Sequence, residues 1–107
     1  MTTSRKTPKS YANVGELERQ FGPVSVGRLL KAFREGDELS QAEFARRLGI
    51  SRANLCDIEQ GRKQVSVGRA AKFAKVLGLP EAAVVQYALQ EQLRTAKLKL
   101  KVAVRAA

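Results

Sequence analysis

The side chains best suited to a chemical role in this chain lie in the segment 39–63, whose two halves meet at a glycine turn. Arg52 can form paired hydrogen bonds with guanine, and Asn54 can do so with adenine or can hold a phosphate. Ala53 could touch a thymine methyl group, and Asp57 could accept a hydrogen bond from cytosine, orient Arg52 or repel other bases. These residue types indicate recognition of base edges, with an ordinary solvated helix surface as the alternative.

A second group of side chains is suited to the phosphate backbone of a nucleic acid. Gln41 would lie beside exposed backbone amides at the start of a helix, a position that suits an anion. Arg62 and Lys63 follow the next helix and could clamp phosphates, although basic residues at a helix end also stabilise the helix dipole. The two serines have helix capping as their alternative role. The candidate phosphate contacts are Ser40, Gln41, Ser51, Arg62 and Lys63.

The composition argues against several other kinds of site. The chain has no histidine, which removes the commonest general base and the commonest metal ligand. Its single cysteine, Cys56, cannot form an internal disulfide, and we interpret it as a packing or surface residue of a protein in a reducing compartment. No apolar run could span a bilayer, and no apolar stretch follows the basic N-terminus as in a signal peptide. We therefore expect a cytoplasmic protein with no enzymatic activity, cofactor, metal or membrane partner.

The net charge of +10 is concentrated at the two ends of the chain. Three basic residues lie in 1–10 and four in 97–107, and neither stretch contains an acid. Such a balance favours a polyanionic partner, DNA first, through phosphate contacts and counterion release. The alternative is that these charges only keep a small domain soluble.

Apolar residues at helical spacing, serine caps and glycine stops predict the elements that position these side chains. Ser40 and Glu43 form a capping box, and Gly49 is placed for the left-handed conformation of the sharp turn. Gly36 and Gly61 are expected to end their helices. A short helix is predicted over 15–21, and five longer helices over about 25–36, 40–48, 51–60, 67–77 and from Glu81 onward.

The string VSVGR occurs twice, at 24–28 and 65–69. Two copies are too few for a solenoid, which needs about three repeats to be stable. The favoured interpretation is that two helices begin with the same serine cap, Ser25 in one and Ser66 in the other.

The C-terminal residues change to a period of two, with apolar residues alternating with lysine or alanine. This pattern predicts a β-strand, with a helical continuation through Leu93, Ala96 and Leu100 as its rival and a frayed basic tail as the alternative to both. A lone strand cannot satisfy its backbone, so we expect antiparallel pairing with a second copy in a homodimer. The residues expected to form this interface are Leu98, Leu100, Val102 and Val104.

The segment 25–85 resembles the Cro/C1-type (Xre-like) helix-turn-helix regulators of phages and bacteria. The resemblance covers more than half of the chain but not residues 1–24. It rests on Leu39, Ser40, Gln41, Ala45, Leu48, Gly49, Ile50, Ser51, Ile58, Glu59 and Gly61. It implies an all-α, lambda-repressor-like domain of five helices, here followed by a strand that resembles the dimer-forming extension of some family members.

The resemblance also implies roles for individual residues. Gln41 would donate to a DNA phosphate, and the helix 51–60 would enter the major groove of double-stranded DNA. Arg34 and Glu59 stand where the family has a partly buried ion pair that ties the first helix to this recognition helix and orients it. The implied function is sequence-specific regulation of transcription, most simply repression, by a nucleoid-associated homodimer.

Three parts of the chain follow from these expectations. Residues 1–24 form a basic arm with a short helix, in which Arg5 and Lys6 could add phosphate or minor-groove contacts. Residues 25–80 form the helix-turn-helix domain, and 81–107 the last helix with the dimerisation strand. Two alternatives stay open. An antitoxin would bind a protein toxin as well as its own operator, and a non-specific architectural protein would show no sequence preference.

Overall fold

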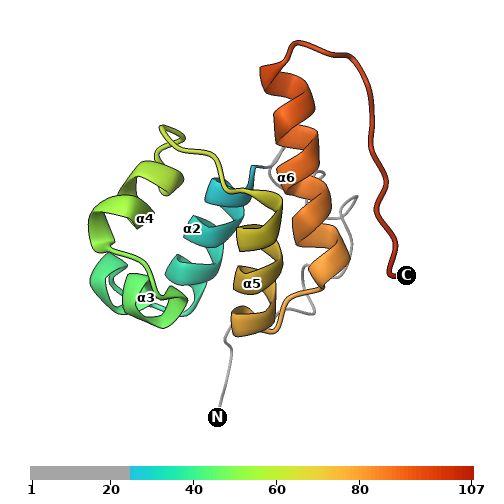
Figure 1. Cartoon of the computed structure of the whole chain (residues 1–107). Helices are drawn as coiled ribbons and strands as arrows, with labels where there is room; N and C mark the ends of the chain where they lie inside the picture. The colour runs from blue at the N-terminus through green and yellow to red at the C-terminus, as the bar shows by residue number, and fades with distance from the viewer. Residues whose placement is uncertain (1–24) are drawn as a thin grey trace.

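Five helices follow one another along residues 25–107, the part of the chain that the computed structural model describes (Figure 1). None of these residues lies in a β-strand, so the predicted all-α class is confirmed. The short helix predicted over 15–21 and the arm residues Arg5 and Lys6 lie outside the described residues. The helices are α2 (Val26–Gly36), α3 (Gln41–Leu48), α4 (Arg52–Glu59), α5 (Val67–Leu77) and α6 (Glu81–Thr95).

Serine side chains start four of these helices, as the sequence predicts. The Ser25 hydroxyl accepts from the Arg28 amide at 3.1 Å, and the Ser66 hydroxyl accepts from the Arg69 amide at 3.2 Å. The capping box of α3 is complete, and the serine before α4 caps it in the same way. Each cap satisfies an amide that has no partner inside its own helix.

The helix ends match the predictions less closely. Gly49 has φ of 77° and takes the left-handed conformation expected of the turn between α3 and α4. Gly36, in contrast, is the last helical residue of α2 and not the residue that caps the end of the helix. The chain reverses after it through Glu38, whose φ of 57° is also left-handed. The Leu39 amide then donates to the Arg34 carbonyl at 3.0 Å, which completes the turn.

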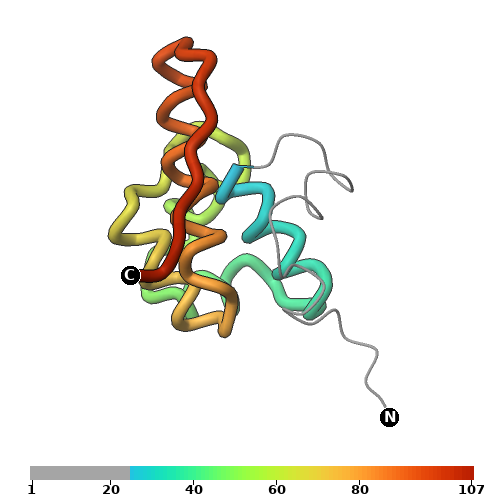
Figure 2. Tube along the Cα trace, turned by 90° about the vertical axis from the view of Figure 1, so that its right-hand side faces the viewer, coloured from blue at the N-terminus to red at the C-terminus, as the bar shows by residue number. Residues whose placement is uncertain are grey.

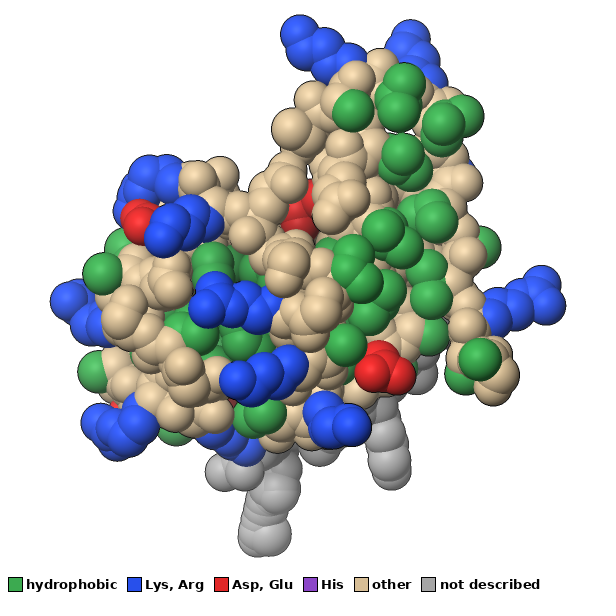
Figure 3. Space-filling view, viewed as in Figure 1, with side chains coloured by type: hydrophobic (Ala, Val, Ile, Leu, Met, Phe, Trp, Pro, Cys, Tyr) green, Lys and Arg blue, Asp and Glu red, His purple; other side chains and the backbone are tan. Residues whose placement is uncertain are grey.

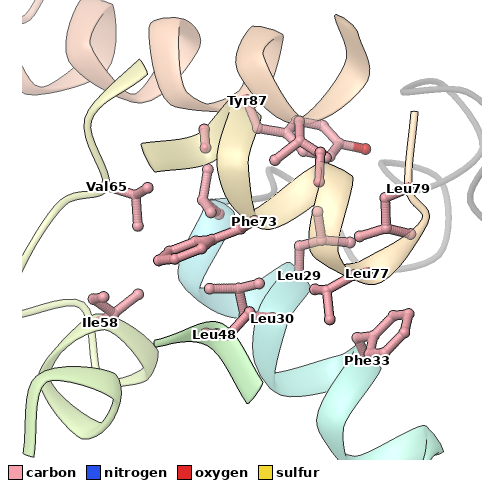
Figure 4. Close-up of a cluster of buried hydrophobic side chains, with 14 of the residues drawn as sticks. Leu29, Leu30, Phe33, Leu48, Ile58, Val65, Phe73, Leu77, Leu79 and Tyr87 are labelled. Carbon is pink, nitrogen blue, oxygen red and sulfur yellow. The ribbon is translucent and has the colours of Figure 1, made fainter. Parts of the chain in front are cut away.

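Side chains from all five helices meet in one apolar core (Figure 4). Burial of each large side chain contributes roughly 1.5–3 kcal/mol to folding, so this cluster supplies most of the stability of the domain. One buried residue from each helix, in chain order, is Leu30, Leu48, Ile58, Phe73 and Tyr87. In Figure 1, α5 and α6 lie on one side of α2, and the pair α3 and α4 lies on the other.

The start of α2 is fixed by two neighbours that are distant in the sequence. Gly27 is buried against α4 so closely that a Cβ atom there would lie 2.1 Å from the carbonyl oxygen of Ile58. The Val26 amide donates to the carboxylate of Glu91 on α6 at 3.1 Å. The backbone of α2 therefore sets the position of α4.

The C-terminal segment forms neither the predicted strand nor the helical alternative. α6 ends at Thr95, and Lys97 has φ of 61°, a left-handed conformation. The Leu98 amide donates to the Leu93 carbonyl at 2.9 Å, so the chain turns back on itself. Figures 1 and 2 both show the segment after this turn running back along α6. The prediction of a β-strand is wrong for the single chain.

Two glutamines of α6 explain this correction. The Gln90 amide donates to the Leu100 carbonyl at 2.8 Å and accepts from the Val102 amide at 3.0 Å. Gln86 accepts from the Val104 amide, also at 3.0 Å. The prediction assumed that only another strand could satisfy this backbone, but a side-chain amide carries both a donor and an acceptor. One edge of the extended segment is thus bound to its own helix.

None of the helices in residues 25–107 is both long enough and apolar enough to cross a membrane.

Candidate nucleic-acid interface

One face of α4 points outward from the unit that α3, α4 and the turn between them form. Leu55 and Ile58 anchor α4 in the core, and the half-buried Ile50 packs against the core from the turn. The opposite face carries Arg52 and Ala53, which are exposed. A basic and a small side chain therefore protrude from a helix whose other side is fixed, which is the arrangement needed to insert a helix into a groove.

The predicted ion pair between Arg34 and Glu59 is present, and it joins α2 to α4. The Arg34 Nε lies 2.8 Å from Glu59 Oε2, and its Nη2 lies 3.1 Å from Oε1, so both carboxylate oxygens are bound. The Glu59 side chain is only 1% exposed. The hydrogen bond from Arg34 to Glu59 raises the pKa of the arginine. A bidentate pair of this kind fixes orientation as well as charge.

Gln41 is the third member of this cluster, which its predicted role did not anticipate. Its Nε2 donates to Glu59 Oε1 at 3.1 Å, from the first residue of α3. A glutamine amide nitrogen carries two hydrogens, so the second remains available to another acceptor. Glu59 therefore orients both the helix it belongs to and the side chain predicted to contact a phosphate.

The loop after α4 folds back onto the outward face of that helix. The amides of Arg62 and Lys63 both donate to the Asp57 carbonyl, at 2.8 and 3.2 Å. The Arg62 Nε lies 2.9 Å from Asp57 Oδ1, and its guanidinium also reaches the Cys56 sulfur at 3.7 Å. The bond to Asp57 raises the pKa of Arg62. Lys63 Nζ donates to Asn54 Oδ1 at 2.9 Å.

These bonds supply the positive charge that α4 lacks in its own sequence. The helix carries one basic residue, Arg52, against two acids, Asp57 and Glu59. Arg34 neutralises Glu59, and the returning loop brings Arg62 next to Asp57. Arg52 makes no ion pair with any residue in 25–107, so it is the cation of α4 that is free to meet a ligand.

Sequence reasoning missed the partners of Asp57 and Asn54. Asp57 was expected to face a base or Arg52, but it holds Arg62. The one signal in the sequence was Gly61, because its left-handed φ of 82° makes the return of the loop possible. The hydroxyls of Ser40 and Ser51 accept from the amides at the starts of α3 and α4, and their own O–H groups can still donate.

The side of the molecule seen in Figure 3 has two chemically different regions. Figure 3 shows lysine and arginine side chains gathered over α3, α4 and α5, and hydrophobic side chains over α6 and the C-terminal segment. On α3, the guanidinium of Arg47 lies 3.7 Å from the carboxylate of Asp37. Residues 25–107 contain no group of three or more acidic, cysteine or histidine side chains that could hold a metal ion. The arrangement suits an anionic ligand.

Comparison with known proteins agrees with this geometry. A family described as "Helix-turn-helix domain" matches residues 25–86. The chain is 34% identical over 62 residues to an immunity repressor protein of Bacillus phage phi105, a match that covers 58% of this chain and 43% of that protein. It is 39% identical over 54 residues to the ImmF control region 10 kDa protein of the same phage, covering 50% of this chain and 60% of that protein. The matched region is thus under two thirds of either relative's length. No solved structure matches the chain significantly.

Proposed function

The chain belongs to the family of helix-turn-helix domains, and from that membership we propose that it is a sequence-specific, DNA-binding repressor of transcription. The observation that carries the proposal is the free guanidinium of Arg52 on the outward face of a helix that Arg34 and Glu59 hold in place. A base-reading side chain needs such a fixed support, because a small displacement removes its paired hydrogen bonds.

In this proposal α4 enters the major groove with its N-terminal half toward the bases. Arg52 reads a guanine, Ala53 touches a thymine methyl group, and Asn54 offers its amide to a base edge or a phosphate. Asp57 acts through Arg62, because its carboxylate positions the Arg62 guanidinium over the outward face of α4. Phosphates on either side of the groove are bound by Ser40, Gln41, Ser51, Arg62 and Lys63.

We further propose that the repressor binds as a homodimer whose copies meet at the C-terminal segment. Leu98 and Leu100 are 49% and 58% exposed, which is high for large apolar side chains beside a core. The glutamines of α6 bind one edge of the segment. On the other edge, the backbone groups of Lys99, Lys101 and Ala103 have no partner in residues 25–107. Two such edges can pair across a two-fold axis.

A dimer of this kind makes a geometric prediction about its operator. Two copies of α4 related by a two-fold axis fit half-sites about one helical turn apart, roughly 34 Å, or a multiple of that spacing. The repressor would act on the DNA of the nucleoid, in the cytoplasm. The names of both phage relatives refer to immunity or its control region, and neither favours the antitoxin alternative.

Selection of bound fragments from random duplex DNA tests the whole proposal. A palindromic consensus is the expected result, and the absence of any consensus would contradict sequence-specific reading by a dimer. Arg52→Ala should then cost roughly 1–3 kcal/mol at the consensus and relax preference at one base pair of each half-site. Gln41→Ala should weaken binding to all sequences about equally. Arg105 lies on the C-terminal segment, and Arg105→Ala serves as the control for lost charge. It should change neither the base preference at the consensus nor the binding to other sequences.

The dimer is tested separately by the mass of the protein in solution. Light scattering should give twice the mass of the chain, and replacing Leu98 and Leu100 together by serine should shift the equilibrium toward the monomer. A wild-type protein that remains monomeric at high concentration and on its consensus DNA would rule out this part of the proposal.

A further inference from the structure

Helix α5 carries a row of basic side chains that the proposed base-reading site does not use. Arg69, Lys72 and Lys75 follow one another at intervals of three residues, so they lie along one side of the helix. All three are exposed. α5 contains no acidic residue, and none of the three makes an ion pair within the described part of the chain. We refer to these three residues as the α5 row.

The α5 row differs from the other cations near α4 because its side chains make no ion pair with any residue in 25–107. Arg62 is bound to Asp57, and Lys63 donates to Asn54. Like charges one helical turn apart repel one another, and an acid three or four residues away would offset that repulsion. Here no such acid exists on the helix, which indicates that the counter-charge comes from a ligand.

The position of the α5 row identifies the ligand. The opposite side of α5, with Phe73 and Leu77, is buried in the core. In Figure 3 the basic side chains continue from α3 and α4 across α5 without crossing the apolar face of α6. The row is therefore an extension of the proposed DNA-binding face, and it begins one turn after the loop that carries Arg62 and Lys63.

We propose that the α5 row binds the phosphate backbone of duplex DNA that flanks the site read by α4. This inference rests on the proposed function and extends it beyond the half-site. From the first to the last residue of the row the helix rises about 9 Å, and one DNA strand places a phosphate every 3.4 Å or so along its axis. The row thus spans two or three successive phosphates. Such contacts carry no base information.

The contact has a measurable consequence, because it exists only when the DNA is long enough to reach α5. The wild-type protein should bind a long duplex, with the consensus at its centre, more tightly than a duplex trimmed to the consensus. Its affinity for the long duplex should also depend more steeply on salt, by about 0.9 in the log–log slope for each additional phosphate contact.

The test compares two double variants that remove the same charge. Lys72→Gln with Lys75→Gln acts on the α5 row. Lys97→Gln with Arg105→Gln removes two exposed basic residues that flank the proposed dimer residues 98–104 of the C-terminal segment, which lies on the far side of α6 from α4 in Figure 1. Binding of each to the short and long duplexes is measured by fluorescence anisotropy across a range of salt concentrations. Circular dichroism confirms that both variants are folded.

The expected result is that only the α5 variant loses the advantage of the long duplex. Its salt slope on that duplex should fall by about 0.9 for each phosphate contact removed, while its preference for the consensus over random DNA stays unchanged. Equal loss in both double variants would mean that net charge alone is responsible, and this would overturn the proposal, as would unchanged slopes in the α5 variant. A wild-type protein that binds no duplex of either length would instead overturn the proposed function itself, and the α5 contact with it.

Discussion

Helices α2 and α5 begin with the same residues and have the same length, but the fold uses them in opposite ways. Both follow a serine cap, both continue Val-Gly-Arg, and both place basic residues at intervals of three along one side. In α2 the last of these, Arg34, is bound to the buried Glu59 of α4. The corresponding residue of α5, Lys75, is exposed and makes no ion pair within residues 25–107.

The glycines of the two helices differ in the same way. Gly27 lies against the backbone of α4, whereas nothing lies within 4 Å of where a Cβ of Gly68 would be. The caps depend on neighbours within three residues, so the repeated sequence gives the same cap twice. The role of each glycine and each cation depends on which helix lies opposite. α2 holds the proposed reading helix, and α5 offers its charges outward.

The loss of stability should differ most between the two helices when their matched cations, Arg34 and Lys75, are replaced. Among residues 25–107, Arg34→Met leaves the buried Glu59 with Gln41 alone as a hydrogen-bonding partner, and breaking a buried pair in this way costs about 3–5 kcal/mol. Lys75→Met removes an exposed charge that has no ion-pair partner in residues 25–107, and it should change stability by no more than about 0.5 kcal/mol. The free energy of unfolding in urea measures both. Similar losses for the two variants would contradict the distinction between a holding helix and a presenting helix.

Replacing the matched glycines, Gly27 and Gly68, should give the next largest changes in stability, with opposite signs. Gly27→Ala forces a Cβ onto the Ile58 carbonyl, so α2 and α4 must separate, at a cost of about 2–3 kcal/mol. Gly68→Ala meets no neighbour and should raise stability by about 0.5–1 kcal/mol, because alanine loses less backbone entropy in a helix. Thermal unfolding followed by circular dichroism gives both signs. A stable Gly27→Ala protein would show that α4 is not held by this close approach.

Replacing the serine caps tests the feature that α2 and α5 share, which is the hydrogen bond at the start of each helix. Ser25→Ala and Ser66→Ala each remove one hydrogen bond to an amide three residues later, and each should cost about 1 kcal/mol. Equal losses are expected in urea unfolding. A much smaller loss for Ser25→Ala would mean that Glu91, which accepts from the Val26 amide, stabilises the start of α2 in its place.

The comparison also shows where sequence reasoning works in this chain. The helices, the four serine caps and the turn at Gly49 depend on chemistry within a few residues, and the sequence predicts them. The pair of Arg34 with Glu59 joins residues that are distant in the chain. It was expected only from the family resemblance, because no local pattern indicates which distant acid an arginine meets.

Other features could not be predicted because they depend on the path of a loop, or on side-chain amides that form the hydrogen bonds expected of a neighbouring strand's backbone. Arg62 reaches Asp57 only after the chain has turned back at Gly61. The alternation after α6 was interpreted as a β-strand, and nothing in it shows that Gln86 and Gln90 would bind the backbone of this segment instead. The two identical pentapeptides give no hint that one glycine is enclosed and the other is not.

The smallest predicted effect concerns how α2 and α5 end. α5 stops at Gly78, whose φ of 71° suits glycine, while α2 reverses through Glu38 at φ of 57°, where an L-residue brings its Cβ close to a carbonyl oxygen. Glu38→Gly should therefore raise the stability by about 0.5–1 kcal/mol, and Gly78→Ala should lower it by a similar amount. Paired urea titrations resolve changes of this size when the slope of the transition is unchanged. If Glu38→Gly instead destabilises the protein, the glutamate side chain contributes more to this turn than its backbone conformation costs, and the end of α2 would join Arg34 in holding the first helix against the reading helix.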